Sequence, residues 1–206
     1  MTLLLTMFWG ASVFPSAPLR MILALRSRPR QAQTAIRIQE GQITEANWQQ
    51  DSRIMAIRRI VGSINADLKG RVFKISEQRL QHCDDDQFFN VRRIARDSKG
   101  AAPWYEHYSE GQDASWDFQY YYDSAGKLRF VFAIARSTNG TREQLRIFFD
   151  ETGRRIWKDD KLLKGTGCPG CFSGYADSDK GLTFDPGKEF ANNEGCEEIK
   201  QGRPSK

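Results

Sequence analysis

Apolar residues alternate with polar ones through the middle of the chain. Between Trp116 and Trp157 they recur at every second position in three runs, at 116–122, 128–134 and 145–149. A period of two is typical of β-strands, because successive side chains point to opposite faces of a sheet. Polar turn sequences separate the runs. The pattern therefore predicts antiparallel strands joined by short hairpins.

Two of these turns share one short sequence motif. Tyr-Asp-Ser-Ala-Gly-Lys at 122–127 returns as Phe-Asp-Glu-Thr-Gly-Arg at 149–154. In each copy an aromatic residue ends one run, Asp opens the turn, and Gly takes a position that favours positive φ. A basic residue then starts the next run. Further strands are predicted from shorter patterns at 71–76, 89–95 and 104–108.

A helical period precedes the strands. Apolar residues fall at steps of three and four, and the stripe consists of Ile54, Ile57, Val61, Ile64 and Leu68. This spacing predicts an amphipathic helix over 47–69 that packs on the sheet. Asn47 followed by Gln50 fits a capping box at its start, and Gly70 fits a stop at its end.

Together these elements predict an α+β fold. We expect a curved antiparallel sheet of about five to seven strands, packed against one N-terminal amphipathic helix and followed by an irregular cysteine-containing tail. The chain then divides into three parts. Residues 1–39 form a signal, targeting or disordered segment, 40–163 form the α+β domain, and 164–206 form the C-terminal extension.

The first forty residues resemble a targeting segment. Residues 3–14 are mostly apolar and have the length of a signal-peptide core, but no Lys or Arg precedes them. An internal start at Met21 with an Arg-rich transit peptide remains open, as does a single-pass anchor over 3–25. Pro15 and Pro18 count against that anchor. The leading expectation is an extracytoplasmic, periplasmic or secreted protein without a stable membrane span.

The net charge of +5 has a local origin. Residues 1–39 hold five arginines and no acid, so 40–206 carry 26 basic and 26 acidic residues. A neutral body lacks the broad basic face that binds phosphate backbones. Nucleic acid is therefore not an expected partner.

The order of helix and paired hairpins resembles a family of uncharacterised bacterial proteins, many of them exported or lipid-anchored. Ile64-Asn65 and the segments 120–131 and 146–157 carry the resemblance. It implies a fold and an exported location, but no reaction. The cysteine-bearing tail lies outside it, and no lipid-attachment cysteine occurs near the start.

Four cysteines, Cys83, Cys168, Cys171 and Cys196, offer two kinds of chemistry. Their even number suits disulfides in an oxidising compartment. The Cys168-Pro-Gly-Cys171 knuckle with Cys196 and either Cys83 or His82 could instead complete a tetrahedral zinc site. Unpaired thiols remain a third possibility.

No stretch carries a catalytic signature. The only histidines are His82 and His107, and the chain has no Gly-rich phosphate loop, zinc-binding His pair or nucleophile elbow. We therefore expect no enzyme activity and no cofactor. His107 is expected to be satisfied within an aromatic cluster.

The leading hypothesis is a non-enzymatic extracytoplasmic binding module that contacts a protein or cell-envelope ligand. The hypothesis rests on a surplus of aromatic residues outside the main stripes, some of which are expected to stay exposed. They are Trp104, Tyr105, Tyr121 and Phe148. The alternative is a zinc-dependent protein that uses the C-terminal cysteines. Ligand identity and oligomeric state do not follow from the sequence.

Overall fold

The computed structural model describes residues 41–81, 89–167, 172, 178–192 and 197–198. Residues 41–206 form one unit by their contacts, apart from residues 1–40. The order of elements is α1 (Ser52–Lys69), β1 (Lys74–Gln81), β2 (Phe89–Arg96), β3 (Trp104–Glu110), β4 (Ala114–Tyr122), β5 (Leu128–Ser137), β6 (Arg142–Phe149), β7 (Arg155–Lys164), α3 (Pro186–Ala191) and β8 (Glu197–Glu198).

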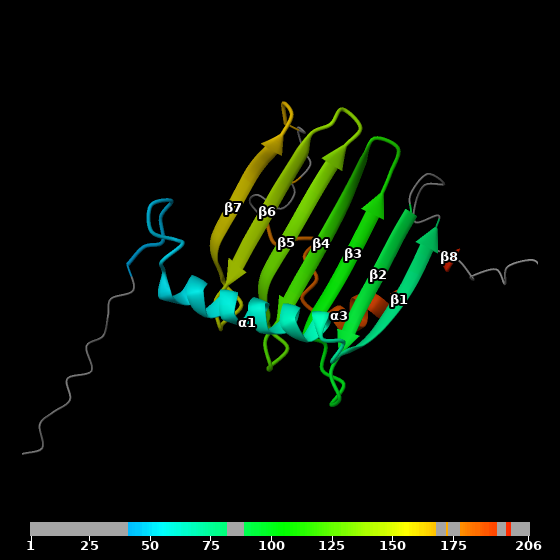
Figure 1. Ribbon diagram of the computed structural model, residues 1–206, viewed down its shortest axis with the longest axis horizontal. Coiled ribbons are helices and arrows are strands. Elements are labelled where there is room, and N and C mark those ends of the chain that lie inside the picture. The colour runs from blue at the N-terminus through cyan, green and yellow to red at the C-terminus, as the bar shows by residue number, and fades with distance from the viewer. Residues whose placement is uncertain (1–40, 82–88, 168–171, 173–177, 193–196, 199–206) are drawn as a thin grey trace, which may run out of the picture. The chain divides into compact units, whose positions relative to one another are not determined.

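All the strands belong to one antiparallel sheet, in the order β7-β6-β5-β4-β3-β2-β1-β8 (Figure 1). Strands β1 to β7 run up and down in chain order. The two-residue β8 returns from the tail and pairs with Leu80 and Gln81 at the β1 edge. The predicted α+β class with an antiparallel sheet is confirmed, although strand predominates over helix.

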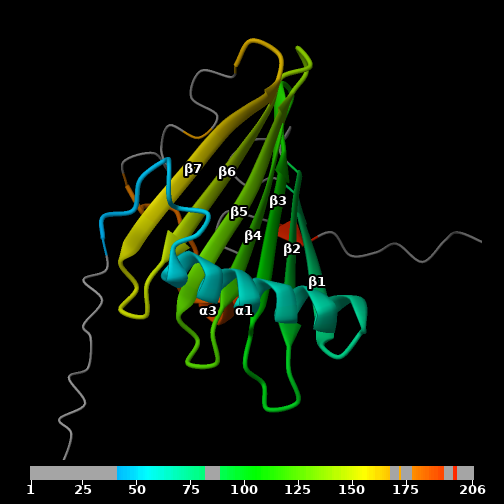
Figure 2. The ribbon, with the colours of Figure 1, turned by 60° about the vertical axis from the view of Figure 1, so that its left-hand side comes forward.

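The sheet has an apolar core on each of its faces. Helix α1 crosses one face near the strand ends, and α3 lies on the other (Figure 2). The α1 side buries Trp48, Ile54, Ile57, Ile64, Trp104, Tyr121, Phe130 and Phe148. The opposite side buries Tyr105, Phe118, Tyr120, Tyr122, Val131, Leu145, Ile147 and Phe149. Each fully buried large side chain contributes about 1.5–3 kcal/mol, so both layers stabilise the sheet.

The predicted stripes do not all face the helix. Phe130 and Phe132 pack on the α1 side, whereas Tyr120 and Ile147 pack on the opposite side. One reason is a register shift between Tyr121 and Tyr122, which breaks the simple alternation along β4 and β5. The other is that both faces are buried, so that residues of both parities are apolar and parity alone cannot identify the helix side.

Helix α1 begins later than the sequence predicts. Asp51 is the N-cap, and its Oδ1 accepts a hydrogen bond from the Arg53 amide at 2.9 Å. Asn47 instead accepts from the Thr44 amide at 2.8 Å, within the turn that leads into the helix. The predicted start at Asn47 is therefore wrong.

The C-terminus of α1 also differs in detail. Gly70 ends the helix as predicted and donates to the Ala66 carbonyl at 2.8 Å, but its φ is −73°. Arg71 takes the left-handed conformation, with φ of 57°. The chain turns into β1 one residue after the glycine, at a position that is unusual for a side chain.

The C-terminal segment is part of the second face. The sequence predicts an irregular extension over 164–206, but its described parts include α3 and β8. Phe172 and Leu182 join the core of that face, and the Tyr122 hydroxyl donates to the Thr183 carbonyl at 2.7 Å. Asp185 caps α3 by accepting from the Lys188 amide at 2.9 Å. The tail thus covers the sheet face that α1 leaves open.

The duplicated turns have the same geometry. The Oδ1 of Asp123 accepts from the Ala125 and Lys127 amides at 2.9 and 3.0 Å. The Oδ1 of Asp150 likewise accepts from the Thr152 and Arg154 amides at 2.9 and 3.0 Å. Gly126 and Gly153 have φ of 75° and 84°, as the turns require. A third copy at Asp97 accepts from the amides of residues 99 and 101.

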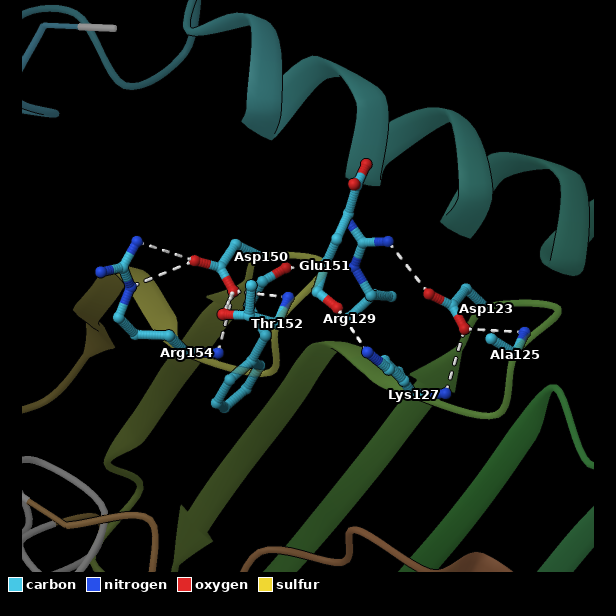
Figure 3. Close-up of polar contacts among 9 residues, drawn as sticks. Asp123, Ala125, Lys127, Arg129, Asp150, Glu151, Thr152 and Arg154 are labelled. Atoms are coloured by element: carbon cyan, nitrogen blue, oxygen red, sulfur yellow. Dashed lines mark hydrogen bonds and ion pairs between the residues drawn. The ribbon is translucent and has the colours of Figure 1, made fainter.

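Basic side chains join the two duplicated turns (Figure 3). Lys127 Nζ donates to the Glu151 carbonyl of the neighbouring turn at 2.9 Å. Arg129 is buried and donates to Asp123 Oδ2 at 3.0 Å and to the Phe149 carbonyl at 3.2 Å. Asp123 therefore holds both its own turn and a buried guanidinium, whereas Asp97 holds only a turn.

Substituting these two aspartates separates the two roles. We expect Asp97→Ala to lower the free energy of unfolding by about 1 kcal/mol, the usual loss for a turn hydrogen-bond acceptor. Asp123→Ala is expected to lower it by about 2–3 kcal/mol, because Arg129 also loses its carboxylate partner. Urea unfolding followed by tryptophan fluorescence measures both losses. Equal losses in the two variants would contradict the role given to the Asp123–Arg129 pair.

Candidate functional site

The four aromatic residues predicted to form a ligand face are all buried. Trp104, Tyr105, Tyr121 and Phe148 are 7%, 0%, 4% and 2% exposed. Trp104, Tyr121 and Phe148 lie on the α1 side, and Tyr105 packs on the opposite side. The expectation that some of them stay exposed is wrong, because α1 covers three of them and the second layer on the opposite face buries Tyr105.

The predicted cysteine chemistry lies outside the described part of the chain. Cys83, Cys168, Cys171 and Cys196 all fall in undescribed segments, and so does His82. Among the residues that the structure does describe, no three His, Cys, Asp or Glu side chains gather as metal ligands. Disulfide and zinc therefore both remain predictions.

His107 has a partner that holds it in place. Its Nε2 lies 3.1 Å from Asn90 Oδ1 on the neighbouring strand β2. Burial, with a smaller contribution from the Arg92 charge, lowers the pKa of His107 to about 4. The ring is neutral at physiological pH, and its role is to fill a polar position on the sheet face that the tail covers.

Two carboxylates with perturbed pKa values lie on the α1 side of the sheet. Burial raises the pKa of Glu106, which pairs with Arg93, and it also raises the pKa of Asp117. Asp117 Oδ1 is buried and has no hydrogen-bond partner among the described residues. Raised carboxyl pKa values occur at acid–base sites, but they also occur in structural networks. The perturbed pKa values alone therefore identify no particular reaction.

The raised pKa of Asp117 gives a pH-dependent prediction. The folded state holds this proton more tightly than the unfolded state, so ionisation at neutral pH destabilises the fold. Asp117→Asn should therefore stabilise the protein at pH 7 by roughly 0.5–1 kcal/mol, and the gain should vanish near pH 3, where aspartate is protonated in both states. Urea unfolding at the two pH values measures the gain.

Asp113→Asn serves as the control, because it removes the same charge at an exposed position. A gain that persists at pH 3, or an equal gain for Asp113→Asn, would contradict burial as the cause.

Within the part of the chain that the structure describes, a groove between α1 and the sheet is a candidate binding site. Its volume is about 340 Å³, and it is lined by Arg58, Val61, Gly62 and Asn65 of α1 and by Phe130, Arg146 and Phe148 of β5 and β6. The helix residues follow a spacing of three and four, so they form one flank of α1 beside its buried stripe. The size is at the lower end of small-ligand pockets, which are about 300–1,000 Å³.

The floor of the groove is apolar and rigid. The Phe130 and Phe148 rings lie 4.8 Å apart, centroid to centroid, and form cross-strand partners on β5 and β6. Trp48 packs against Phe148 at 6.0 Å and stacks on Trp157 at 6.1 Å. These contacts hold the floor in place before any ligand arrives.

Cations gather beside this floor. The Arg58 guanidinium carbon lies 5.0 Å from the centroid of the Trp48 ring, and Lys161 Nζ lies 5.7 Å from the same centroid. Arg146 and Lys161 share one carboxylate, Asp159, at 3.2 and 3.3 Å. Arg58 and Arg146 line the groove, while Lys161 and Asp159 lie next to it.

Gly62 widens the groove. A Cβ atom added at this helix position would meet nothing within 4 Å, and the φ of Gly62 lies outside the left-handed region. Glycine inside a helix is about 0.8–1 kcal/mol less favourable than alanine. The chain therefore carries a locally unfavourable residue at the place where a side chain would narrow the groove.

Sequence patterns gave little warning of this site. A glycine within the helical period is one recognisable signal. Arg58 looks like one more residue of a solvated helix face, and Arg146 like an ordinary polar position on a strand. Only the crossing of α1 over β5 and β6 brings them to the same groove.

Comparisons with protein-family models, with curated proteins and with solved structures found no match for this chain. Within the described segments, no helix has the length and apolar character needed to cross a bilayer.

Proposed function

We propose that the protein is a non-enzymatic binding module whose ligand site is the groove between α1 and the sheet. The observation that carries the proposal is a pocket of about 340 Å³ that joins an apolar floor to several polar groups. Such a combination is the usual form of a small-molecule site. This groove replaces the four buried aromatic residues as the proposed contact surface.

The rigidity of the groove supports a binding role. Its floor is built on β5 and β6, which pair along their length, and its roof is a helix anchored by Ile54, Ile57 and Ile64. Sites on rigid elements lose little conformational freedom when a ligand binds.

The chemistry of the lining favours binding over catalysis. The groove presents two guanidinium groups, an amide and apolar side chains, and among the described residues its lining includes no carboxylate, histidine, serine or cysteine. General acid–base catalysis needs a group that exchanges protons near neutral pH, which arginine does not do.

The proposal includes an extracytoplasmic location with paired cysteines, on the strength of the apolar leader and the even cysteine number. Zinc held by the C-terminal cysteines is the alternative. Thiol counting with and without a reductant, together with metal analysis, separates the two. About one zinc per chain would favour the alternative.

Filling the groove tests the proposed site. Nile red is a neutral dye whose fluorescence rises in apolar pockets, and we expect the intact protein to bind it in the groove. Gly62→Leu should weaken this binding about tenfold or more, because the new side chain occupies the dye's volume. The variant should fold at least as stably as the parent, since leucine favours helix over glycine by up to about 1 kcal/mol.

Ser63→Leu is the matched control, because Ser63 is exposed on the same helix and does not line the groove. It should leave dye affinity unchanged within about twofold. Absence of dye binding by the parent, or equal binding by both variants, would overturn the proposed site.

A further inference from the structure

We infer that the groove selects a small amphiphile with an anionic head, a carboxylate or a phosphate monoester, on an apolar tail. This inference rests on the proposed function and adds the chemical class of the ligand. It follows from four observations: the charge of Arg58, which has no carboxylate partner among the described residues, the anchoring of Arg146, the donor character of the polar lining, and the apolar side chains of the groove.

Arg58 carries a charge without a carboxylate partner among the described residues. Its guanidinium donates to the Gln49 carbonyl at 3.2 Å and lies over the Trp48 ring. A carbonyl and an aromatic face orient the group, but neither neutralises it. The side chain is therefore held at the groove with its charge available to an anion.

Arg146 is anchored more firmly. Its Nη1 donates to Asp159 Oδ2 at 3.2 Å. With the Gln144 amide oxygen turned toward it, Nε and Nη2 donate to that oxygen at 3.2 and 3.0 Å. These bonds engage three of the five N–H donors of the guanidinium, which leaves two for a ligand. The fixed position suits directional hydrogen bonds to a carboxylate or phosphate oxygen.

The polar side chains of the lining present donors. Asn65 Oδ1 accepts from the Tyr121 hydroxyl at 3.1 Å, so its amide NH₂ is the group that remains for a ligand. Asn65, Arg58 and Arg146 therefore offer only N–H donors to a ligand. These donors complement a head group that only accepts hydrogen bonds, such as an anion. A neutral alcohol would satisfy them less well, and a cation would be repelled.

The rest of the ligand must be apolar. Phe130 and Phe148 are 8% and 2% exposed, and Val61 is half-buried beside them. An amphiphile places its tail against Val61 and the small exposed part of Phe130, while its head meets the arginines.

Three ligands with the same eight-carbon tail separate head-group chemistry from tail burial. Octanoate and octyl phosphate are anionic, and 1-octanol is neutral. Their affinities for the intact protein are measured by displacement of Nile red at constant ionic strength. We expect the tighter of the two anions to bind at least about tenfold more tightly than octanol, and the comparison of the two identifies the preferred head.

Arg58→Gln is the test variant, and Arg59→Gln is its matched control. Both remove one positive charge from exposed neighbouring positions on α1, but only Arg58 lines the groove. Arg58→Gln should weaken anion binding about tenfold and leave octanol binding within about twofold, whereas Arg59→Gln should change neither by more than about twofold.

The outcomes separate this inference from the proposed function. Octanol and both anions could bind with equal affinity, and Gly62→Leu could weaken the binding of all three. That result would overturn the anion preference and leave the groove as a binding site. Equal losses in Arg58→Gln and Arg59→Gln would assign the preference to the general field of the helix and would also overturn the inference. Failure of all three ligands to displace the dye would count against both claims.

Discussion

Burial of the sheet on both faces is the constraint on which the rest of the structure depends. Strands β3 to β6 carry large apolar side chains at positions of both parities, so one covering layer leaves half of them in water. Helix α1 supplies one layer, and the described parts of the tail supply the other. Phe172 and Leu182 are therefore structural residues, even though they lie beyond the hairpins that the sequence makes prominent.

The groove follows from the way the first layer is built. A straight helix that crosses the strands near one end covers only part of a sheet face (Figure 1). Its flank meets β5 and β6 along Val61 and Gly62, and the missing side chain at Gly62 leaves the space open. The buried stripe fixes the position of the helix, so the flanking residues Arg58, Gly62 and Asn65 are held in place, while Val61 packs partly buried against the core.

Sequence reasoning predicted the repeated elements well, because their signals are local. An Asp that opens a turn and a Gly with positive φ need only their immediate neighbours, and Asp123 and Asp150 behave as expected. The prediction of an aromatic ligand face was wrong for a non-local reason. Whether Tyr105 or Phe148 meets water depends on a tail that returns from far along the chain and on a helix that precedes the sheet. The Arg58–Arg146 site could not be predicted for the same reason, since its two cations lie on different elements.

The central claim is that ligand binding takes place between α1 and the β5–β6 surface. Amide chemical shifts recorded by NMR during an octanoate titration test it most directly. The account predicts that the largest changes occur in α1 between Arg58 and Asn65 and in β5 and β6 near Phe130 and Phe148, with small changes in β1 and α3. Changes centred on α3 and the tail-covered face, or no saturable changes at all, would contradict it.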